Sequence, residues 1–218
     1  MPTILNIAYV VLTAEPLDRD DLVPLPERSL LRLRGSSVKD LNLMAGLPHQ
    51  RLVSRSVGPG AARLAAEEAL HEALDLADRH EGLVLDLQTP RILETPVPDQ
   101  RPAAGWFTFE YDLDNLGEIR THGLSVLGLP EIIVRNVPED ERKMYDMVVV
   151  GLVHRLLDEW PKHDPVGPAH VTLGDIMAGY EGGEAGPTDR GVDVLVDYDA
   201  DVPALTVEVM TRPGPALF

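Results

Sequence analysis

The 218-residue chain contains no cysteine. This absence excludes disulfide bonds, thiolate metal sites and cysteine nucleophiles, and a large core without cysteine suits a reducing cytosol. The chain also has no run of about 18 uninterrupted apolar residues, so we expect no membrane span. Its first residues carry no basic charge and are typical of a strand, not of a signal peptide. We therefore expect a cytoplasmic protein.

Basic residues are scarce. Lysine and arginine total 19 against 36 acidic residues, which gives a formal net charge of -17. Nonspecific binding to nucleic acid or to an anionic membrane needs a basic surface, so this balance argues against both. A basic protein partner is compatible with it. The plainest explanation is that the acidity keeps the protein soluble.

Several motifs of known chemistry are missing. Gly58-Pro59-Gly60 precedes a helical pattern, but it lacks the lysine and hydroxyl residue of a P-loop and the spacing of a dinucleotide fingerprint. No Gly-x-Ser-x-Gly nucleophile elbow occurs. We expect a plain turn at Gly58–Gly60 and no cofactor.

The hydrophobic pattern predicts an α+β protein. Apolar residues recur at helical spacing over residues 61–80 and again over 138–159. Between and around these helices, short runs rich in β-branched and aromatic residues predict strands. The expected architecture is a mixed, mainly antiparallel sheet packed against two principal helices. The expected strands cover residues 4–12, 51–56, 83–87, 106–113, 118–121, 131–135, 169–173, 191–197 and 205–210, with a short helix or strand near 38–45 and an irregular segment over 14–35.

Proline and glycine punctuation defines the ends of these elements. Asn136, Pro138 and Glu139 match a capping box with proline in the first turn, so we expect Asn136 to cap the helix over 138–159. Residues 95–105 are rich in proline and resemble a linker. We expect one domain over residues 1–218, and the alternative is two lobes, 1–95 and 104–218, joined by this loop.

Two segments resemble a group of uncharacterised bacterial proteins of unknown function. The first is Glu81-Gly-Leu-Val-Leu-Asp-Leu-Gln-Thr, and the second is Thr121-His-Gly-Leu-Ser-Val-Leu-Gly-Leu-Pro-Glu-Ile. They resemble that group's G-x-V-x-D-x-Q strand and T-x-G-[LM]-x-x-[FL]-G-x-P-E segment, in the same order, over residues 64–160. Leu127 stands where an aromatic residue is expected. The resemblance implies an α+β fold and brings no activity with it.

The C-terminal region concentrates negative charge. Between residues 171 and 211 there are nine acidic residues and one arginine, Arg190. The spacing Asp197-x-Asp199-x-Asp201, with Glu208 further on, resembles an EF-hand loop, but Val202 occupies the glycine position and Pro203 follows. Without that glycine the loop cannot make its sharp turn. We predict an acidic hairpin and no metal site. The candidate binding residues are Asp193, Asp197, Asp199, Asp201 and Glu208.

Catalytic candidates are few. His122 lies in a glycine-rich turn with Glu131 nine residues on, so the two could form an acid–base pair, although a turn histidine is the simpler interpretation. His154 and Asp158 fall on one helix face at i, i+4, but no third metal ligand follows at recognisable spacing.

Three functions are consistent with these patterns. We favour a non-enzymatic acidic binding protein, of the immunity or inhibitor type, whose C-terminal acids meet a basic partner. The second is a small hydrolase or metal-dependent enzyme that uses His122 and Glu131. The third is an accessory domain that forms a homodimer through a sheet edge.

Overall fold

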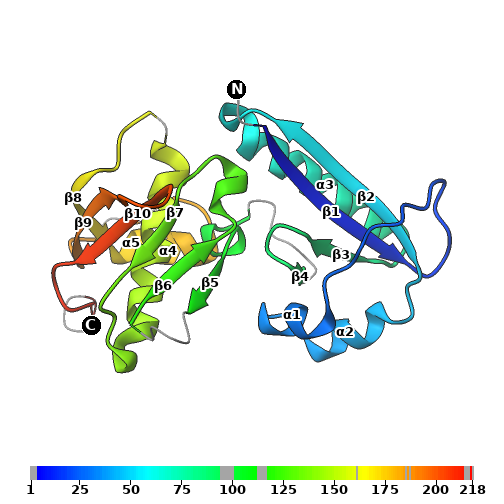
Figure 1. The fold of residues 1–218 in the computed structure, drawn as a ribbon, viewed down its shortest axis with the longest axis horizontal. Helices are drawn as coiled ribbons and strands as arrows, with labels where there is room; N and C mark the ends of the chain where they lie inside the picture. Colours follow the sequence, from blue (N-terminus) through cyan, green and yellow to red (C-terminus); the bar gives the residue numbers. More distant parts are fainter. Residues whose placement is uncertain are drawn as a thin grey trace. The chain divides into compact units, whose positions relative to one another are not determined.

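The chain folds into two compact units. The computed structural model describes residues 4–93, 101–111, 117–160, 162–184, 186, 188–213 and 217. The first unit comprises Met1–Val97 with Val126–Gly128, and the second comprises Pro98–Ser125 with Leu129–Phe218. Each unit contains its own sheet and helices (Figure 1). The mixed content confirms the α+β class, but with two sheets in place of the one expected. The single-domain interpretation, with two lobes as its alternative, stays a prediction.

The first unit is built on a four-stranded antiparallel sheet in the order β2-β1-β3-β4. Strand β1 lies inside the sheet, with β2 on one side and β3 on the other, which explains why its sequence is apolar on both faces. The strands are β1 (Leu5–Thr13), β2 (His49–Val57), β3 (Leu83–Asp86) and β4 (Arg91–Ile92).

Helices complete the core of the first unit. The long helix α3 (Ala62–Arg79) lies against β1 and β2 (Figure 1). A buried cluster contains Leu31 of α1 (Arg28–Leu33) and Leu41 of α2 (Val38–Met44). Two alternate residues of β1, Val10 and Leu12, belong to the same cluster. Helix α1 falls in the segment expected to be irregular, so that expectation is wrong for residues 28–33. Buried Leu31 is the contact that stabilises this short helix.

The second unit contains a six-stranded sheet in the order β5-β6-β7-β10-β9-β8. All neighbouring pairs are antiparallel except β7 with β10, which run parallel near the centre. The predicted hairpin between residues 191–197 and 205–210 is confirmed as β9 and β10. The strands are β5 (Thr108–Tyr111), β6 (Ile119–His122), β7 (Glu131–Val134), β8 (Gly167–Thr172), β9 (Gly191–Tyr198) and β10 (Ala204–Val209).

Two helices pack against one face of this sheet and against each other. They are α4 (Arg142–Glu159) and α5 (Leu173–Glu181). Gly151 of α4 lies so close to Val171 of β8 that an added Cβ would be 2.7 Å from its Cγ1. Helix α5 begins with a capping box in which Thr172 and Asp175 bond each other's backbone N–H.

The start of α4 differs from the capping prediction. Asn136 adopts a left-handed conformation with φ 59°, and a 3₁₀ turn, η4 (Glu139–Glu141), precedes the helix. The helix therefore begins at Arg142, and the predicted Asn136 cap is wrong, because Pro138 leads into the 3₁₀ turn instead. The other 3₁₀ turns are η1 (Pro59–Ala61), η2 (Ala103–Gly105) and η3 (Leu124–Leu127).

Parts of two expected segments are not described by the structure. Residues 95–100 of the proline-rich segment and residues 112 and 113 of the strand expected over 106–113 lie outside the described residues. Every helix in the described part of the chain is too short or too polar to span a lipid bilayer.

Candidate functional site

Buried and exposed residues alternate along β9, and the exposed ones give one face of the sheet a negative charge. Its valines at positions 192, 194 and 196 are buried, whereas Asp193, Leu195 and Asp197 are exposed. Successive side chains on a strand point to opposite faces, so these three exposed residues share one face. Val192 pairs with Val171, which contacts α4, so the exposed face is the one opposite that helix.

Strand β10 adds to the same face. Glu208 lies directly across from Leu195, and Thr206 lies across from Asp197. Glu208 is exposed, as is Asp197. The sheet therefore presents Asp193, Asp197 and Glu208 around the apolar side chain of Leu195, and we refer to these four residues as the acidic face.

A hollow of about 340 Å³ adjoins the acidic face, between β8, β9 and the end of β10. Leu195, which is 40% exposed, and Met210, which is 60% exposed, both line it. At its edge, His170 Nδ1 lies 2.7 Å from Asp193 Oδ1, and the Asp193 side chain is still 65% exposed. The site thus combines carboxylates that reach solvent with an apolar centre.

Asp199 has a different role from the other predicted binding acids. Its carboxylate accepts hydrogen bonds from the backbone N–H groups of Asp201 (2.9 Å) and Val202 (3.2 Å) in the β9–β10 turn. Arg135 Nη2 donates to it at 2.7 Å, and only 3% of the Asp199 side chain is exposed. Asp199 therefore holds the turn, whereas Asp201 is exposed on it.

The ion pair between Asp199 and Arg135 predicts that acid destabilises the second unit. The backbone N–H of Asp201 and then the Arg135 guanidinium lower the pKa of Asp199 below its ordinary value of 3.8. A carboxyl group whose pKa is lower in the folded state stabilises the fold above about pH 4 and loses that contribution as the pH falls through the folded pKa. We expect Asp199→Asn to destabilise the second unit at pH 7, with the difference from wild type shrinking below pH 4. Urea unfolding at several pH values measures it.

Asp201→Asn is the matched control for this measurement. Asp201 lies two residues away on the same turn, but its carboxylate is exposed. Its unfolding curve should follow that of wild type at every pH. An Asp199→Asn variant whose deficit stays constant from pH 7 to pH 3 would contradict the role of the ionised carboxylate.

The Glu131 carboxylate is hydrogen-bonded to the end of β6 and to the turn that follows it. One carboxylate oxygen accepts from Thr121 Oγ1 at 2.8 Å, and the other accepts from the N–H groups of Gly123 (3.1 Å) and Ser125 (3.0 Å). Thr121 and His122 are neighbours on β6, so their side chains point to opposite faces. The structure places Glu131 with Thr121 and does not bring it to the His122 imidazole.

The remaining candidates do not form a cluster. His154 and Asp158 lie one turn apart on α4, as their spacing predicts. Within the described residues, no group of three histidine, aspartate or glutamate side chains could hold a metal ion. The EF-hand-like spacing falls on a β-hairpin, where Asp199 is already bonded to the turn.

Sequence reasoning missed several residues that shape this site. Arg135 pairs with Asp199 from 64 positions away, a distance that no local pattern reveals. Met210 and Leu195 supply the apolar centre, and only the alternation of β9 could have indicated Leu195. No protein-family model, curated protein or solved structure matches the chain.

Proposed function

We propose that this chain is a non-enzymatic binding protein that engages a basic protein partner through the acidic face. The observation that carries the proposal is the shared orientation of Asp193, Asp197 and Glu208 on an exposed sheet surface. A continuous face of this kind is suited to docking against a surface of opposite charge. An immunity or inhibitor protein, which occludes a basic surface of its target, is the type that best fits it.

The two components of the site have separate roles in binding. The carboxylates accelerate encounter with a basic partner, because opposite charges steer diffusion at low ionic strength. Leu195 and Met210 provide apolar area that a partner can bury, and such area contributes affinity that salt does not screen. The expected partner surface therefore carries lysine or arginine around at least one apolar side chain.

Charge also argues against a second copy of this chain as the partner on this face, because two acidic faces repel each other.

In the first unit, the edge of β2 is partly covered by side chains. The Asp20 carboxylate accepts from Gln50 N at 2.7 Å, and Asp21 accepts from Leu52 N at 3.0 Å. Side chains that occupy edge amides hinder strand-to-strand association. These contacts disfavour pairing through the β2 edge, and homodimer formation through another sheet edge stays a prediction.

Affinity capture from a lysate of the native cell tests the proposal. The immobilised 218-residue chain is exposed to lysate at low and at high salt, and the retained proteins are identified by mass spectrometry. We expect a basic protein that is retained at low salt and released at high salt, because exposed charge pairs are screened by ions. If nothing basic is retained at either salt, the proposal is wrong.

A further inference from the structure

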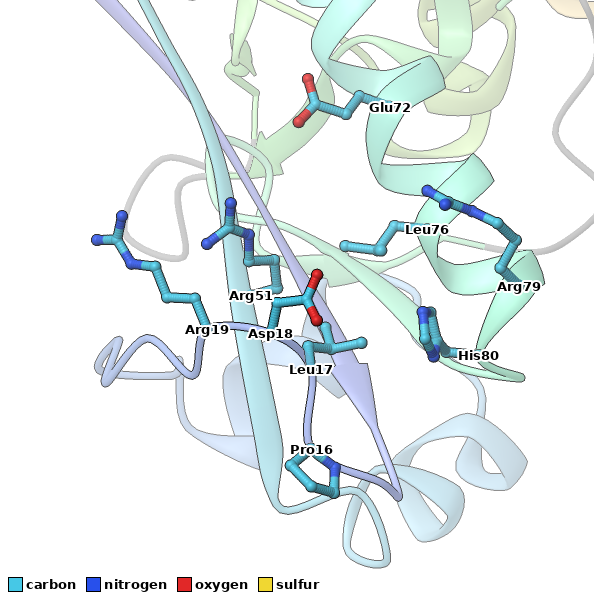
Figure 2. Close-up of a pocket in the computed structure, with 9 residues that line it drawn as sticks. All are labelled: Pro16, Leu17, Asp18, Arg19, Arg51, Glu72, Leu76, Arg79 and His80. Atoms are coloured by element: carbon cyan, nitrogen blue, oxygen red, sulfur yellow. The ribbon is translucent and has the colours of Figure 1, made fainter.

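The first unit contains a cavity of about 300 Å³. It lies between the loop that follows β1, strand β2 and the last turns of α3 (Figure 2). This volume is at the lower end of the range of roughly 300–1,000 Å³ that is typical of small-molecule sites. The size therefore suits a small organic molecule.

Three arginines line this cavity, one from each of its walls. Arg19 comes from the loop, Arg51 from β2 and Arg79 from α3 (Figure 2). The whole chain has only 19 basic residues against 36 acidic ones, so three arginines around one cavity depart from its general character. Guanidinium groups bind carboxylates and phosphates through paired hydrogen bonds.

Asp21 forms ion pairs with two of these arginines without lining the cavity itself. Its Oδ1 lies 2.7 Å from Arg19 Nε, and its Oδ2 lies 3.6 Å from Arg51 Nη1. The backbone N–H of Leu52, and to a smaller extent the two arginines, lower the pKa of Asp21, so this carboxylate stays ionised. Arg19 and Arg51 thus meet at one carboxylate beside the cavity, and the Arg19 side chain is still 73% exposed.

The lining also contains two acidic residues, and one of them is already paired. Glu72 forms an ion pair with Arg55 of β2, so its charge is opposed by a residue outside the lining. Asp18 is the other lining carboxylate. Arg79 Nε donates to the carbonyl oxygen of Asp75 at 3.1 Å, which anchors this guanidinium at the end of α3.

We propose that this cavity binds a small organic anion that carries a carboxylate or a phosphate group. Arg51 and Arg79 approach the anionic group from the β2 and α3 sides, and Arg19 adds charge at the loop. Leu17 and Leu76 contact the apolar part of the molecule. Asp18 accepts a hydrogen bond from a hydroxyl or amine group of the ligand. This site belongs to the first unit and does not depend on the proposed function of the acidic face.

NMR titration of the 218-residue chain tests the site. Benzoate and phenyl phosphate are the probes, because they share an apolar ring and differ in the anionic group, and sodium chloride controls for ionic strength. We expect saturable amide shifts around residues 16–19, 51 and 72–80 with one probe or both. A response to one probe alone identifies the anionic group. If neither probe produces saturable shifts at millimolar concentration, the proposal is wrong.

Some variants are expected to weaken probe binding and one is expected to strengthen it. This contrast separates an effect on binding from an effect on folding. Arg51→Gln and Arg79→Gln should each weaken probe binding by about tenfold, because each removes a charge-assisted contact. Glu72→Gln should strengthen binding, since it removes a negative charge from the lining. Arg63→Gln, on α3 but outside the lining, is the control and should leave binding unchanged. Binding that is equal in all four variants would overturn the proposal.

Discussion

Replacement of Asp193, Asp197 and Glu208 by lysine should abolish capture of the basic partner at low salt. The three side chains share one exposed face, so the triple substitution changes that face from acidic to basic. Loss of electrostatic steering lowers association rates by at least roughly tenfold, and the new like-charge contacts add repulsion. The fold should survive, because the buried side of β9 is untouched.

A second triple variant separates the acidic face from total charge. Glu68, Asp75 and Asp78 are exposed on α3 in the first unit, and their replacement by lysine changes the net charge by the same amount. This control should capture the partner as wild type does. Equal loss in the two variants would show that overall charge, and not the acidic face, governs binding.

The substitution Gly179→Ala should destabilise the second unit by about 1–3 kcal/mol, the range of an overpacked core. An added Cβ at this position of α5 would lie 2.9 Å from the backbone oxygen of Val150 in α4. A backbone atom inside a helix cannot move aside as a side chain can. Intrinsic helix propensity acts in the opposite direction, since alanine is favoured over glycine by about 1 kcal/mol. A loss of stability in urea unfolding would therefore report the steric clash.

Gly60→Ala is the control for this prediction. At Gly60 an added Cβ meets no atom within 4 Å. This variant should be neutral, or stabilised by up to about 1 kcal/mol through lower entropy of the unfolded chain. If Gly179→Ala behaves like Gly60→Ala, then α4 and α5 do not pack as closely as described. The buried valines of β9 would then lack the support that positions the acidic face.

Most strands and both long helices could be predicted from the sequence, because their signals are local. The apolar run near the N-terminus predicted a strand over residues 4–12, and β1 lies there, between β2 and β3. Helical periodicity over residues 61–80 predicted α3 to within one residue at each end. The division into two sheets was not predictable, because strand pairing over long separations depends on tertiary contacts that no local pattern contains.

The candidate site was only partly predictable for the same reason. Alternation along β9 was sufficient to place Asp193 and Asp197 on one face. Nothing in the sequence distinguished Asp199 from them, because its role depends on Arg135 and on the turn amides. Glu131 was selected for its closeness to His122 in sequence, yet its carboxylate bonds to Thr121 and the following turn. The arginines of the cavity are spread along the chain and form no motif.

The most direct test of the account is the association rate of the captured partner, measured by stopped flow at increasing ionic strength. For the wild-type chain we predict a rate that falls steeply with salt, because long-range attraction by the acidic face is screened. The variant in which lysine replaces Asp193, Asp197 and Glu208 should associate slowly. Added salt should not lower its association rate further. A wild-type rate that is independent of salt would contradict binding through the acidic face.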